Sequence, residues 1–111
     1  MPHSQAEADV ERDGRHRHMV EAAAHYLALQ VRLLRTSRKM TVAALARRAH
    51  VAKHLIVKIE AGRIFEDDDV TTEHMSRIAT VFDVAFMAQF VPFSTFTPPT
   101  YPQEKSSADT R

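Results

Sequence analysis

Basic side chains concentrate in the middle third of the chain, in an arrangement that suits contact with a polyanion. Residues 31–63 hold nine lysines and arginines and a single acid, Glu60, although the formal net charge of the whole chain is only +1. The ten residues that follow, 64–73, hold five acids and no base. A strongly positive block inside a nearly neutral protein indicates a nucleic-acid partner, and otherwise a solvated basic face.

Catalytic and metal-binding patterns are weak by comparison. The chain has no cysteine and only two glycines, which excludes thiolate chemistry and argues against a glycine-rich phosphate loop. No nucleophile lies in a set with a base, so we predict no enzyme activity and no cofactor. His50 and His54 flank a corner instead of sharing one helix, and the acidic run 66–69 lacks the spaced ligands of a calcium loop. We therefore predict no metal and a solvated acidic loop.

Hydrophobic periodicity places the basic block on short helices. Residues 19–38 contain helix formers without glycine or proline, and their apolar side chains recur every three or four positions. Thr41 is a suitable N-cap for a second helix that ends near residue 49. A third helix is predicted over residues 52–61, with Gly62 closing its C-terminal end. Seven of the nine basic residues thus lie on three consecutive helices, and Lys39 and Arg63 lie just outside them.

The remaining segments divide the chain into one domain with two extensions. Thr71 or Thr72 caps a fourth helix whose apolar residues keep helical spacing, so the domain is predicted over residues 18–83. Residues 1–17 are polar and patternless and are predicted to be a disordered arm. The proline- and serine-rich residues 97–111 are predicted to be a loose tail.

An aromatic, apolar stretch follows the fourth helix. Residues 84–91, VAFMAQFV, end at Pro92 and read as a β-strand. A strand needs hydrogen-bond partners, and no second strand is evident, so we predict pairing with a strand of a second subunit within an extension at residues 84–96. The predicted dimer contacts are Val84, Phe86, Met87 and Phe90.

The second and third predicted helices have the features of a helix-turn-helix. Such a unit needs a small residue in its first helix, an apolar residue at the corner and polar residues at the start of its second helix. Ala46 is the small residue and Val51 the corner residue. The residues left to face outward from the third helix are Lys53, His54, Val57 and Lys58.

With these residues, the segment 31–82 resembles the Cro/C1-type (XRE) helix-turn-helix family of phage repressors, bacterial regulators and antitoxins. The resemblance implies a mainly α, lambda-repressor-like domain of four to five helices with one C-terminal β-strand. The chain differs from many relatives in having Val42 instead of Gln, His50 instead of Gly and Ala52 instead of Ser. The matched positions are Val31, Leu34, Arg35, Thr41, Leu45, Ala46, Ala49, Val51, Ile56, Ile59, Glu60 and Gly62.

The resemblance also implies roles for individual residues. Lys53 and His54 would read base edges, Val57 would contact a thymine methyl group, and Lys58 would reach a base edge or a phosphate. Thr41, at the start of the second helix, would present backbone N–H groups to a phosphate. Further phosphate contacts are expected from Arg38, Lys39, Arg47 and Arg63.

A structural ion pair is implied as well. Arg35, late in the first helix, matches the position of an arginine that pairs with the glutamate ending the third helix, here Glu60. The pair would fix the third helix to the first.

Taken together, the sequence predicts a transcriptional regulator, more specifically a repressor. It would bind a palindromic operator in double-stranded DNA as a homodimer, in the cytoplasm of a bacterium or encoded by a phage. No apolar run approaches the ~18 residues of a membrane span, so no membrane partner is predicted.

One alternative is an antitoxin, or another interaction protein, whose C-terminal strand binds a toxin or other partner. A second alternative is a helix-turn-helix that has lost DNA binding, as Val42, Ala52 and the acidic loop suggest.

Overall fold

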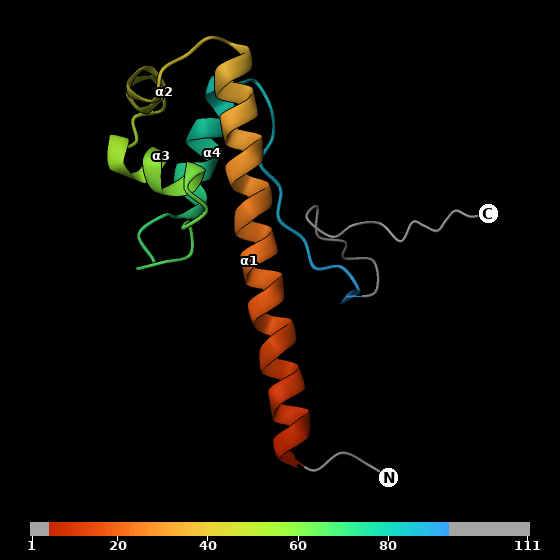
Figure 1. The fold of residues 1–111 in the computed structure, drawn as a ribbon. Helices are drawn as coiled ribbons and strands as arrows, with labels where there is room; N and C mark the ends of the chain where they lie inside the picture. Colours follow the sequence, from red (N-terminus) through yellow and green to blue (C-terminus); the bar gives the residue numbers. More distant parts are fainter. Residues whose placement is uncertain (1–4, 94–111) are drawn as a thin grey trace, which may run out of the picture.

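The chain folds into one long helix with three short helices gathered at its C-terminal half (Figure 1). The computed structural model describes residues 5–93. Its elements are α1 (Gln5–Ser37), α2 (Val42–Ala49), α3 (Lys53–Glu60) and α4 (Thr72–Val81). The prediction of a mainly α protein is confirmed, and the residues described contain no strand.

The hydrophobic core lies where the three short helices meet α1. α3 packs against α1, and α2 packs against both α3 and α4. Leu45, Ile56, Ile59 and Phe82 are almost completely buried at this junction, and Val31 joins them from α1. Full burial of one such side chain contributes about 1.5–3 kcal/mol, so this cluster fixes the relative positions of α2 and α3.

The ends of the short helices follow the local signals in the sequence. The Thr41 hydroxyl accepts a hydrogen bond from the Ala44 N–H at 3.0 Å and caps α2. Thr71, and not Thr72, caps α4: its hydroxyl accepts from the His74 N–H at 3.2 Å, and its own N–H donates to His74 Nδ1 at 3.0 Å. Gly62 has a φ of +78° just after α3, where glycine is favoured.

The N-terminal region differs from the predicted disordered arm, because residues 5–17 continue α1. Local side-chain pairs suit an exposed helix: Gln5 and Arg12 both hydrogen-bond to Asp9, three or four residues away. The Arg15 guanidinium also lies 4.8 Å from the centre of the Phe93 ring. Sequence periodicity missed this part because its apolar residues are few. Residues 1–4 lie outside the described part.

Residues 84–93, which we call the C-terminal strap, form an extended stretch beside α1 (Figure 1). The Val84 N–H donates to the Ala79 carbonyl at 3.0 Å, and Phe86 packs against the core. Met87 and Phe90 are exposed. The predicted β-strand is not confirmed in the single chain, and its pairing with a second chain stays a prediction. Residues 94–96 and the predicted tail lie outside the described residues.

Candidate nucleic-acid interface

The corner between α2 and α3 is held by backbone and packing contacts. His50 has left-handed backbone angles (φ 56°, ψ 45°), which are uncommon for a residue other than glycine. Val51 is buried, and its N–H donates to the Ala46 carbonyl at 3.0 Å. Arg77 of α4 donates to the His50 carbonyl at 3.0 Å, a contact that the sequence did not predict. Contacts from α2 and α4 thus hold both His50 and Val51.

The first two turns of α3 present an open face. Lys53, His54 and Val57 are all exposed, as predicted. The side chains of Lys53 and His54 form no hydrogen bond or ion pair within residues 5–93, and His54 interacts electrostatically with Asp69. Ala52 precedes α3 without a side-chain cap, which leaves the first N–H groups of this helix without a side-chain acceptor.

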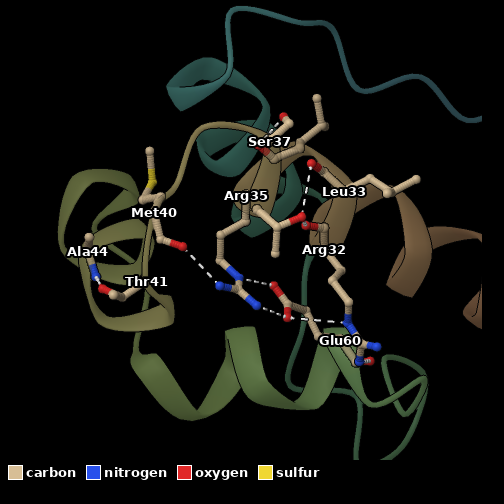
Figure 2. A network of polar contacts seen from close by, with 10 residues as sticks. Arg32, Leu33, Arg35, Ser37, Met40, Thr41, Ala44 and Glu60 are labelled. Atoms are coloured by element: carbon tan, nitrogen blue, oxygen red, sulfur yellow. Dashed lines mark hydrogen bonds and ion pairs between the residues drawn. The ribbon is translucent and has the colours of Figure 1, made fainter.

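The far end of α3 is fixed to α1 by the predicted ion pair (Figure 2). Arg35 donates to both carboxylate oxygens of Glu60, at 2.7 and 2.8 Å, and its third nitrogen donates to the Met40 carbonyl at 2.9 Å. Glu60 is 8% exposed and Arg35 16% exposed. The hydrogen bonds that Arg35 donates to the Glu60 carboxylate raise the pKa of Arg35. Two-point pairing of this kind restricts the orientation of α3.

Arg32 adds a contact that the sequence did not predict. Its guanidinium donates to the Glu60 backbone carbonyl at 2.9 Å and lies 3.8 Å from the Glu60 carboxylate. The sequence feature that could have indicated this contact is the position of Arg32 three residues before Arg35, because residues three apart are neighbours on a helix surface. Both arginines thus hold the end of α3, which leaves them less available to DNA.

Lys58 differs from its predicted role. It was expected to face outward to a base or phosphate, but it is only 5% exposed. Its Nζ donates to the Glu66 carbonyl and to the carboxylates of Asp69 and Asp67. The acidic loop therefore folds back on α3, and its carboxylates pair with the Lys58 ammonium. The prediction of a solvated loop is wrong for this part of it. Of the four residues predicted to face outward from α3, only Lys53, His54 and Val57 are exposed.

The Lys58–Asp69 pair predicts a pH-dependent stability. The hydrogen bond from Lys58 lowers the pKa of Asp69, and the hydrogen bond to Asp69 raises the pKa of Lys58. The contribution of Asp69 is therefore present above its unfolded pKa of about 3.9 and is lost as the pH falls below that value. The contribution of Lys58 is present below its unfolded pKa of about 10.4 and is lost at higher pH.

We expect Asp69→Asn to lower the melting temperature most between about pH 5 and pH 9, with the difference from wild type shrinking below pH 4. Thermal unfolding followed by circular dichroism across this range measures the effect. Asp68→Asn is the control, because Asp68 has no ion pair within residues 5–93 and asparagine tolerates its φ of 53°. Equal pH profiles for the two variants would show that the Lys58–Asp69 pair does not stabilise the fold.

The predicted phosphate-binding residues fall into two groups. Lys39, Thr41 and Arg47 are exposed around α2, and Thr41 also caps that helix. Arg38 is exposed but engaged: it donates to the Phe82 carbonyl at 3.1 Å, and its guanidinium lies 5.2 Å from the centre of the Phe82 ring. Arg63 lies 3.4 Å from Glu66 in an exposed pair. Exposed pairs of this kind contribute at most about 1 kcal/mol, so Arg63 can exchange partners.

Two other kinds of site are absent from the part of the chain that the structure describes. Within residues 5–93 no group of three or more histidine, aspartate or glutamate side chains could hold a metal ion. No helix in the same range is long and apolar enough to cross a membrane.

Comparison with known proteins gives no family assignment. The chain matches no protein-family model, no curated protein and no solved structure.

Proposed function

We propose that the chain is a helix-turn-helix protein of the Cro/C1 type that binds double-stranded DNA. The observation that carries the proposal is the state of α3. One end of this helix presents Lys53, His54 and Val57 to solvent, and the other end is fixed by Arg35 and Glu60. A helix held rigidly at one end with free polar side chains at the other suits insertion into a groove.

The geometry suggests a mode of contact. The N-terminal turns of α3 enter the major groove, where the Lys53 ammonium donates to guanine O6 or N7 and Val57 contacts a thymine methyl group. Lys39 and Arg47 contact phosphates on either side, and the first N–H groups of α2 point to a phosphate near Thr41. Lys58 takes no part in this mode, because it pairs with the acidic loop.

The biological role that follows is transcriptional regulation. A homodimer places two α3 helices in successive major grooves about 34 Å apart, on a palindromic operator. Occupation of a promoter by such a dimer represses transcription without a cofactor. This role places the protein in the cytoplasm of a bacterium, encoded by its chromosome or by a phage.

A second candidate function is supported by the C-terminal strap. Met87 and Phe90 are exposed there, and large exposed apolar side chains mark interaction sites when they cluster. An antitoxin that binds its toxin through this segment, and DNA through α3, fits the same structure. Co-purification of a second protein with the strap would favour this candidate.

The salt dependence of DNA binding tests the proposal. Fluorescence anisotropy with a labelled mixed-sequence duplex should give a log K that falls with log salt at a slope near −5, as about six phosphate contacts require. Arg47→Ala should make the slope smaller by about 1 per chain. Arg12→Ala, on the part of α1 far from α3, should leave it unchanged. Absence of binding at about 50 mM salt would contradict the proposal.

A further inference from the structure

The acidic loop, residues 66–69, is attached to α3 through a single lysine. Lys58 Nζ donates to the Glu66 carbonyl, to the Asp69 carboxylate at 2.5 Å and to the Asp67 carboxylate at 3.4 Å. Residues 67–70 form no backbone–backbone hydrogen bond within residues 5–93. The hydrogen bonds that connect the loop to α3 in this range therefore all end on one ammonium group.

The backbone of the acidic loop adopts a conformation that its residues do not favour. Asp67 and Asp68 both have positive φ angles, 67° and 53°, in the left-handed region where side chains other than glycine are disfavoured. Ile64 is buried before the loop, and Val70 packs against the core after it. Between these two points, the contacts with Lys58 offset the cost of the backbone conformation, so a loss of these contacts frees the loop.

Lys58 lies next to the face of α3 that we propose to meet DNA. An α-helix turns by about 100° per residue, so Lys58 is displaced around α3 by about 40° from His54 and by about 100° from Val57. After the hydrogen bond from Lys58, the charge of His54 also contributes to lowering the pKa of Asp69. The loop thus covers one edge of the exposed face, and Lys58 lies beneath it, only 5% exposed.

The loop brings negative charge to a surface that otherwise suits a polyanion. Within residues 5–93, Lys58 and Arg63 are the only lysine or arginine side chains that pair with its four acids. The carboxylates repel DNA phosphates, and both kinds of anion form charge-assisted hydrogen bonds with an ammonium group. Because Lys58 is buried under the loop, its contact with a phosphate requires release from the carboxylates.

We infer that the acidic loop is an autoinhibitory element whose carboxylates hold Lys58 in the place of a DNA phosphate. The inference rests on the proposed function and adds a regulation of the same surface. Release of the loop adds Lys58 to the phosphate contacts of α3. Because this release has a cost, it disfavours binding to DNA of any sequence, whereas an operator that engages the rest of α3 supplies binding energy that opposes the cost.

Asp69→Asn tests the inference, with Asp68→Asn as the matched control. Both changes remove one charge from the same loop, but of the two residues only Asp69 contacts Lys58. The remaining carboxylate partner, Asp67, is 82% exposed, so its pair with Lys58 is weak.

The affinity for DNA is the first readout. Anisotropy titrations with a mixed-sequence duplex at about 50 mM salt should show about tenfold tighter binding by Asp69→Asn than by Asp68→Asn, as one added phosphate contact per chain predicts. The slope of log K against log salt should become steeper by about 1 per chain for Asp69→Asn alone. Equal affinities and equal slopes for the two variants overturn the inference.

Lys58→Met shows whether the gain in affinity comes from Lys58 itself. Methionine keeps an apolar stem and removes the ammonium group. The double variant Asp69→Asn/Lys58→Met should therefore lose both the tighter binding and the steeper salt slope. If the double variant keeps both, the gain comes from the lower charge of the loop, and the inference is overturned. Circular dichroism at the titration temperature checks that each variant keeps its helices.

Lysine modification measures the release of Lys58 without DNA. Mass spectrometry after brief acetylation should show that Lys58 reacts much more slowly than the exposed Lys53 in the wild type and in Asp68→Asn. In Asp69→Asn the two lysines should react at similar rates. Equal protection of Lys58 in all three proteins overturns the inference.

The titrations also separate this inference from the proposed function. If the wild type binds DNA, and Asp69→Asn binds no more tightly than Asp68→Asn, the inference is overturned and the proposed function stands. If neither the wild type nor Asp69→Asn binds DNA at about 50 mM salt, the proposed function is overturned and the inference with it.

Discussion

Replacement of Glu60 by alanine is expected to lower the free energy of unfolding by about 3 kcal/mol. The change removes the only carboxylate that Arg35 contacts within residues 5–93 and leaves a guanidinium that is 16% exposed. Arg35 then keeps only its hydrogen bond to the Met40 carbonyl. The expected loss lies at the lower end of the range for breaking a buried ion pair, because water reaches part of Arg35.

This loss is large for so small a domain, whose total stability is about 5–10 kcal/mol. The melting temperature should fall by about 15 °C, as measured by circular dichroism, with urea unfolding giving the free energy directly. Glu73→Ala is the control: Glu73 pairs with Arg77 at 2.8 Å, but both side chains are exposed, so its loss should stay below about 1 kcal/mol. Similar small losses in both variants would show that the Arg35–Glu60 pair does not hold α3.

Replacement of Lys53 by alanine is expected to weaken binding to the preferred operator about tenfold or more, since a good contact to guanine contributes about 1–3 kcal/mol of discrimination. Lys53 has no partner within residues 5–93, so its loss should cost no stability. Binding to mixed-sequence DNA should fall much less, because only the phosphate attraction is shared by all sequences. Anisotropy titrations with the operator and with mixed-sequence DNA give the two affinities.

Lys39→Ala is the matched control for Lys53→Ala. Lys39 is exposed in the turn between α1 and α2 and is expected to contact phosphate, so its loss should weaken binding to both DNAs by the same factor. If Lys53→Ala also weakens both equally, Lys53 contacts phosphate and the assignment of base reading to it is wrong.

Local signals in the sequence predicted the helical core and much of the α2–α3 region. Thr41 and Thr71 cap their helices because hydroxyl caps depend on a few neighbouring residues. Arg35 and Glu60, 25 residues apart, were paired only through the resemblance to a known family, and the structure places them in contact. Periodicity alone carries no information about a pair so distant in the sequence.

Other features depend on contacts that no local pattern encodes. Lys58 was predicted to face outward because it remained after the apolar residues of the third helix were assigned to the core. The acidic loop that buries it returns to α3 through a tertiary contact. α1 extends to Gln5 although its first half has few apolar residues. The strap was predicted to be a strand from its composition, which cannot distinguish a paired strand from an extended segment packed on a helix.

Selection of duplex DNA from a random pool by the purified protein tests whether α3 reads a DNA sequence. We expect enrichment of a palindromic site whose half-sites are centred about 10 base pairs apart. Replacement of Lys53 by alanine should remove the base preference at one position in each half-site. A pool that shows no enriched sequence after repeated rounds would contradict the claim that α3 reads DNA. The exposed basic residues would then be a solvated face, and the search for a partner would move to the C-terminal strap.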